Sequence, residues 1–121
     1  MKYMLLIYLT EDAMTEPERQ VCYRESTDLA HELVEKGQFL YTAPLQPVST
    51  ATSVKVRDGK RLVTDGPFAE TREHLGGFFL VDAANLDEAI SIAARIPSAR
   101  KGTVEIRPVL EIPNLPMESG Q

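Results

Sequence analysis

The side chains best suited to chemistry are concentrated in one stretch of this sequence, residues 65–74. The stretch opens with Asp65-Gly66-Pro67-Phe68, in which glycine permits unusual backbone angles, proline fixes one of them, and aspartate can hydrogen-bond the backbone two residues on. Such a turn can hold the Asp65 carboxylate at the mouth of a pocket, where it would orient a ligand or accept a proton. In the alternative, structural interpretation, Asp65 only closes its own loop.

A run of five polar side chains follows this turn: Glu70, Thr71, Arg72, Glu73 and His74. If they lie on a helical turn, Glu70 and His74 share a face at i, i+4, and the carboxylate can orient an imidazole that titrates near neutral pH. Arg72 can bind a carboxylate or phosphate through two parallel hydrogen bonds. The alternative is a solvated charged turn, closed by Gly76-Gly77, that has no chemical role.

Tyr8 completes the candidate set, because its apolar ring and polar tip suit the wall of a cavity; packing in the core with a satisfied hydroxyl is the alternative. His31, on the flank of a predicted helix, and Cys22, in its apolar stripe, are interpreted as structural. The candidates are therefore Asp65 and His74 for catalysis, and Gly66, Pro67, Phe68, Glu70, Arg72 and Tyr8 for ligand binding.

Composition and charge narrow the functional classes. One cysteine and two histidines are too few and too scattered for a dedicated metal site, and no nucleotide- or phosphate-binding motif occurs, so we expect no metal and no cofactor. A net charge of −5 without a cluster of Lys and Arg disfavours nucleic acid, and the longest apolar run, residues 4–9, is too short to cross a membrane. A single cysteine and no recognisable signal peptide favour a cytoplasmic location.

The elements that must position these residues are predicted from hydrophobic spacing and capping signals. Thr15 and Glu18 form a capping box, Asp58-Gly59 between alternating runs predicts a hairpin, and Asn85 begins a second helix. The apolar stripes of the two helices are Val21, Cys22, Leu29, Ala30, Leu33 and Val34 in the first, and Leu86, Ala89, Ile90, Ala93 and Ile96 in the second. In chain order the elements are a strand at 2–9, a helix at 15–36, a strand at 38–42, a hairpin at 53–64, a strand at 78–81, a helix at 85–96 and a strand at 103–112.

This order predicts an α+β fold: a ferredoxin-like β-α-β-β-α-β sandwich with an inserted hairpin, in which both helices cover one face of an antiparallel sheet. The strands at 2–9 and 78–81 are apolar on both sides, so the second face also needs a cover. A second copy packed sheet to sheet is the simplest cover, and we therefore expect a homodimer. Residues 1–113 are expected to form one domain and residues 114–121 a loose tail.

Residues 65–78 resemble the signature of the DGPF family, a branch of the YCII-related proteins. The resemblance is carried by Asp-Gly-Pro-Phe-Ala-Glu-Thr-Arg-Glu at 65–73 and by Leu-Gly-Gly-Phe at 75–78. The resemblance runs over about residues 1–113 and includes Leu-Asp-Glu-Ala at 86–89. It implies a dimeric α+β barrel built from ferredoxin-like units. Most members of the family are small bacterial proteins without an assigned reaction, so the resemblance also implies a bacterial protein. Some members are encoded beside, or fused to, extracytoplasmic-function sigma factors.

A better-studied YCII branch, which this chain also resembles, is proposed to use a His–Asp pair in a cleft. The position that matches the histidine is Ser26, on the first predicted helix. The region that matches the aspartate holds Ser49, Thr50 and Thr52. The pair is therefore not present in this sequence, and its chemistry is not carried over.

Two functions are consistent with the sequence. The first is a small-molecule-binding protein or cofactor-independent enzyme with a pocket near the loop at 65–68, as the fold analogy implies. The second is a non-catalytic regulatory or interaction module linked to sigma-factor-dependent transcription. The first requires polar groups that converge inside an otherwise apolar pocket, whereas the second does not.

Overall fold

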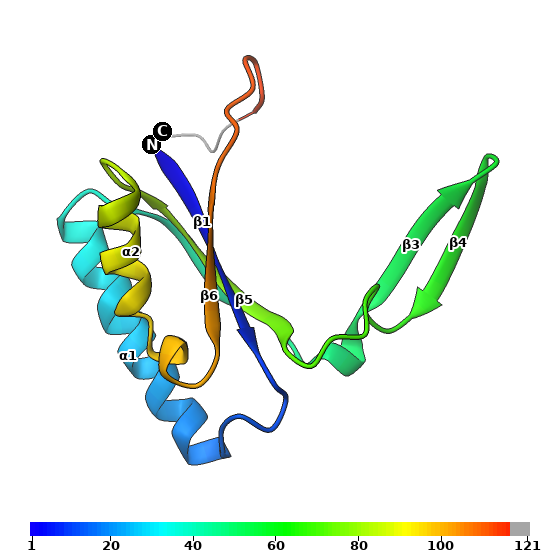
Figure 1. Ribbon diagram of the computed structural model, residues 1–121, viewed down its shortest axis with the longest axis horizontal. Coiled ribbons are helices and arrows are strands. Elements are labelled where there is room, and N and C mark those ends of the chain that lie inside the picture. Colours follow the sequence, from blue (N-terminus) through cyan, green and yellow to red (C-terminus); the bar gives the residue numbers. More distant parts are fainter. Residues whose placement is uncertain (117–121) are drawn as a thin grey trace.

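The computed structural model describes residues 1–116 and has the predicted α+β architecture (Figure 1). A four-stranded antiparallel sheet has the order β2-β5-β1-β6, and a separate two-stranded sheet pairs β3 with β4. The principal elements are β1 (Lys2–Leu9), α1 (Glu16–Glu35), β2 (Phe39–Pro44), β3 (Thr52–Arg57), β4 (Lys60–Asp65), β5 (His74–Asp82), α2 (Leu86–Ala94) and β6 (Thr103–Pro108), with short 3-10 turns at Val48–Thr50 and Pro97–Arg100. Most of the predicted tail, 117–121, lies outside the described residues.

The core lies between the four-stranded sheet and the two helices, which cover the same face of it (Figure 1). Along β1, alternate side chains point to the helices, and Tyr3, Leu5 and Ile7 are buried. Removal of a side chain such as Leu5 from water stabilises the fold by roughly 2 kcal/mol. The helices, β5 and the residues just after β5 and α2 supply the rest of the buried core: Leu29, Leu33, Phe79, Val81, Ala83, Ala89, Ile92, Ala93 and Ile96.

The predicted start of α1 is confirmed in detail. The Thr15 hydroxyl accepts a hydrogen bond from the Glu18 N–H (3.3 Å), and the Glu18 carboxylate accepts one from the Thr15 N–H (2.8 Å). At α2, the Asn85 side chain accepts from the Glu88 N–H (2.9 Å). These contacts satisfy donors that a helix leaves free in its first turn, so local sequence fixes where both helices begin.

The predicted apolar stripes of the helices are too wide. Val21 and Val34 on α1, and Leu86 and Ile90 on α2, are each more than two-fifths exposed. The cause is geometric, because a helix that packs on one face of a sheet buries a single narrow stripe of its side chains. The four exposed residues lie at the edges of that stripe.

Strand β5 begins four residues earlier than the sequence indicates, at His74 rather than 78. It pairs with β1 through Leu9 and Tyr8, across an irregularity after Ile7, and with β2 through Pro44. The helical turn considered for Glu70 and His74 therefore does not form, because this sheet pairing extends the backbone at His74.

The face of the sheet opposite the helices has no cover within the chain. Met4 and Leu6 of β1, with Phe78 and Leu80 of β5, share this face and remain partly exposed. Tyr41 of β2 lies beside them, with its ring centroid 5.9 Å from that of Phe78. We refer to these five residues as the open face.

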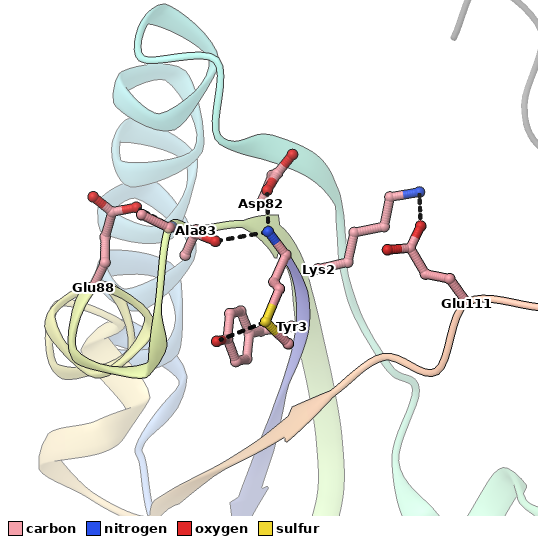
Figure 2. Close-up of polar contacts among 8 residues, drawn as sticks. Lys2, Tyr3, Asp82, Ala83, Glu88 and Glu111 are labelled. Atoms are coloured by element: carbon pink, nitrogen blue, oxygen red, sulfur yellow. Dashed lines mark hydrogen bonds and ion pairs between the residues drawn. The ribbon is translucent and has the colours of Figure 1, made fainter.

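One end of the sandwich is closed by polar contacts, as Figure 2 shows. The N-terminal ammonium of Met1 donates to the Asp82 carboxylate (3.1 Å) and to the Ala83 carbonyl (2.9 Å). Nearby, Lys2 forms an ion pair with Glu111 (3.6 Å). These contacts hold the start of β1 against the end of β5, so any opening between the layers lies at the other end of these strands.

Two adjacent glycines of β5 provide a test of this packing. A Cβ atom added at Gly77 would lie 2.9 Å from the Ala43 carbonyl oxygen, whereas at Gly76 the nearest atoms are 4.0 Å away. We expect Gly77→Ala to lower the free energy of unfolding by about 1–3 kcal/mol, because β2 must move away from β5. Gly76→Ala, the control, should change it by no more than about 0.5 kcal/mol. Urea unfolding measures both, and equal effects would contradict the described contact of β2 with β5.

Candidate functional site

A cavity of about 650 Å³ lies between α1 and the ends of β1, β2 and β5, at the end of the sandwich away from the N-terminus. Its apolar wall is formed mainly by Ile7, Leu9, Ala30, Leu75 and Phe79. Its polar wall comes largely from one face of α1, with Arg19, Tyr23, Ser26, Thr27 and His31. His74, at the start of β5, also lines the cavity. Apolar walls with a few convergent polar groups are typical of small-molecule sites.

His31 and His74 are brought to the same cavity from two elements that are far apart in the sequence. The sequence predicted a catalytic role for His74, but it indicated for His31 only a structural position on the flank of the helix, without a chemical role. The missed signal is a spacing: His31 follows Thr27 by four residues and Tyr23 by eight, so the three lie along one face of α1. Two imidazoles therefore line this cavity, and each can donate or accept a hydrogen bond.

The loop before β5 positions the His74 ring. The Thr71 hydroxyl donates to the Glu73 carbonyl, and its oxygen lies 3.5 Å from His74 Nδ1. The hydroxyl proton is directed to Glu73, so we infer that this oxygen accepts from Nδ1–H and that Nε2 is the acceptor of the ring. Glu73 is held in turn by the Thr103 hydroxyl, at 3.1 Å.

The rim of the cavity carries a compensated pair of charges. Arg19 donates to Glu16 at 2.9 Å, and the Gln20 amide donates to the same carboxylate at 2.8 Å. The hydrogen bond from Gln20, followed by that from Arg19, lowers the pKa of Glu16 from its ordinary value. Glu16 therefore stays ionised and offsets the charge of Arg19, so the rim does not favour a strongly anionic ligand.

The Asp65-Gly66-Pro67-Phe68 turn lies away from this cavity in the single chain. Asp65 ends β4 and is exposed, and Phe68 is 78% exposed with the Lys55 ammonium 5.1 Å from its ring centroid. Gly66 has a φ of +102°, which favours glycine, and its N–H donates to the Ala51 carbonyl (2.7 Å). The contact of Gly66 closes the base of the β3–β4 hairpin, while a role of Asp65 in binding or catalysis stays a prediction.

The other candidates are also outside the cavity lining. Glu70 and Arg72 are exposed, and Tyr8 is half-buried on the sheet face opposite the helices. Of the residues selected from the sequence, His74 alone lines the cavity, and roles in binding for the others stay predictions. Ser26, which matches the histidine of the better-studied branch, does line it.

No group of three His, Cys, Asp or Glu side chains within residues 1–116 is arranged to hold a metal ion. Cys22 is buried, with its sulfur 3.4 Å from the Ser98 hydroxyl. In the same part of the chain, no helix has the length and apolar character needed to cross a membrane.

The four-stranded antiparallel sheet, the two helices on one face and the cavity at one end define a ferredoxin-like α+β protein. The family model of the YCII-related domain matches residues 1–113, and the chain belongs to this family. It is also similar to an uncharacterised protein of Rhizobium meliloti (strain 1021), with 36% identity over 114 residues that cover 90% of this chain and 92% of that protein.

The contact between Thr71 and His74 predicts which imidazole nitrogen carries the proton. At about pH 8.5, where imidazoles are neutral, we expect Nδ1–H in the native protein and in Thr71→Ser, which keeps the acceptor. Thr71→Val removes the acceptor and should shift His74 towards the Nε2–H form. Proton–nitrogen correlation NMR of the ring distinguishes the two forms. The same tautomer in all three proteins would show that Thr71 does not position His74.

Proposed function

We propose that this chain is a small-molecule-binding protein, and a candidate cofactor-independent enzyme, whose ligand occupies the cavity between α1 and the sheet. The observation that carries the proposal is the combination of size and lining. A volume of about 650 Å³ falls within the range of small-molecule pockets. Apolar walls with two imidazoles and several hydroxyls suit a ligand with an apolar body and a few hydrogen-bonding groups.

The histidines are proposed to act on the polar part of the ligand. Nε2 of His74 is free to accept a proton or a hydrogen bond, because Nδ1 faces Thr71. His31 approaches from α1, together with the hydroxyls of Tyr23 and Thr27. Groups of this kind can support proton transfer at a carbon or oxygen of the ligand without a cofactor.

A neutral aromatic alcohol, 2-naphthol, is a suitable probe of the cavity because it has a rigid apolar body and one polar group. We expect Ser26→Phe to lower the affinity for 2-naphthol by at least about tenfold, because the new ring fills the cavity. Ser91→Phe is the control, since Ser91 is exposed on α2, outside the cavity lining. NMR titration of both variants measures the affinity.

The outcome separates binding in the cavity from binding elsewhere. Shifts of the amides of Ala30, His31 and Leu75 on titration, lost in Ser26→Phe and kept in Ser91→Phe, would support the cavity as the site. Equal affinity in both variants would contradict it. The melting temperature, measured in parallel, shows whether either variant has lost stability.

We also propose that the protein is a homodimer in which the open faces of two copies pack against each other. The open face presents a continuous set of apolar side chains from β1, β2 and β5 that the single chain leaves partly in water. A patch of this kind is unusual on a monomer, and a stable sheet-to-sheet interface would bury roughly 1,500 Å² in total.

Replacement of Leu6 tests the dimer. We expect Leu6→Lys to yield a monomer at a concentration of about 10 µM, because a charge at the centre of the interface is costly to bury. Leu86→Lys, on the helical side of the molecule, is the control and should keep the native mass, since Leu86 is already 51% exposed. Sedimentation velocity gives both masses, and a native protein of monomer mass would reject the proposal.

A further inference from the structure

The β3–β4 hairpin stands apart from the rest of the molecule (Figure 1). We call residues 52–65 the arm. The arm leaves the four-stranded sheet on the side away from the helices, and every residue from Val54 to Asp65 is exposed. Two hydrogen bonds fix its base, from the Gly66 N–H to the Ala51 carbonyl (2.7 Å) and from the Ser53 hydroxyl to the Gly66 carbonyl (2.7 Å). A two-stranded hairpin without packing partners is marginally stable in water, so the arm needs a surface.

One side of the arm is suited to packing against protein. Val54 of β3 pairs with Val63 of β4. Val56 lies on the same side of the arm as these two valines, and so does its cross-strand partner, Arg61. The three valines are 59%, 58% and 61% exposed, respectively. The other side carries Lys55, Arg57 and Lys60 around Leu62. The arm is therefore amphipathic: its valine side lacks a cover, while its basic side is compatible with solvent.

The charge of the arm favours a second copy of this chain as its partner. The arm carries four cations against Asp58 and Asp65, whereas the whole chain has a net charge of −5, so the negative charge lies on the body. None of the arm cations forms an ion pair within residues 1–116. On α1, Asp28 and Glu35 are exposed carboxylates that also have no ion pair in this range.

The reach of the arm is sufficient for a partner that covers the open face. Each strand of the arm has six residues and so spans about 20 Å, while stacked sheets lie about 10 Å apart. An arm that leaves the sheet on the open side therefore extends past the sheet of the partner towards its helical layer. In a two-fold dimer, each copy would give one arm and receive another.

We propose that the arm clasps a second copy of this chain, with the valine side packed on the partner and Arg61, which lies on the valine side, near the partner's carboxylates. This inference rests on the dimer proposed above. It also links the dimer to the cavity, because Pro47 and Val48, between β2 and the arm, line the cavity. Docking of the arm then holds this wall of the cavity in place.

The experiment compares two neighbouring substitutions on strand β4, Val63→Asp on the valine side and Leu62→Asp on the basic side. Both residues are about half exposed in the single chain, at 58% and 48%, and both variants place the same charge on the same strand. We expect Val63→Asp to raise the dimer dissociation constant at least about tenfold and Leu62→Asp to change it less than about twofold. Sedimentation over a concentration series measures both constants.

Hydrogen exchange of the arm amides gives a second measurement. In the native protein the arm amides should be protected, and in the Leu6→Lys monomer they should exchange rapidly. Equal weakening by both arm variants, or a larger effect of Leu62→Asp, would overturn the valine side as the contact. If neither arm variant weakens a dimer that Leu6→Lys dissociates, the clasp is wrong and the sheet dimer stands. A monomeric native protein would overturn both proposals.

Discussion

The structure depends on the burial of one side of β1 beneath two helices. β1 is a central strand of the sheet, paired with β5 on one edge and β6 on the other, and it sends Tyr3, Leu5 and Ile7 into the core. Because side chains alternate along a strand, the same pairing places Met4 and Leu6 on the open face. A shift of one residue in this register would exchange the two sets, so the core, the open face and the position of the cavity are set together.

The cavity exists because small residues stand where α1 and β5 would otherwise fill the space between them. Ser26 and Ala30 face the cavity from the helix, and Gly76 and Gly77 do so from the strand. The lack of a side chain at Gly77 also lets β2 approach β5 closely. One end of the sandwich is closed by the contacts of the N-terminus (Figure 2), and the other end retains the open space.

The loop between β4 and β5 makes two sets of structural contacts. Its first part, with Gly66 in the left-handed region of backbone angles, closes the base of the arm. Its second part, through Thr71 and Glu73, holds the start of β5 where His74 enters the cavity. His74 lines the cavity, whereas Glu70 and Arg72 of this loop are exposed and lie outside its lining.

The sequence by itself determined the features that arise from neighbours along the chain. The capping box at Thr15, the turn at Asp58-Gly59 and the apolar character of β1 each follow from local chemistry, and together they predicted the element order and the α+β fold. Only the tertiary structure decided which polar side chains line the same cavity, because His31 and His74 are 43 residues apart and come from α1 and β5. It also decided where β5 begins, since pairing with Leu9 of β1 extends the backbone at His74 that local charge spacing allowed to be helical. Spacing within one segment shows which side chains share a face, as for Tyr23, Thr27 and His31 on α1, but the register and packing of the folded chain decide which face of another segment they meet.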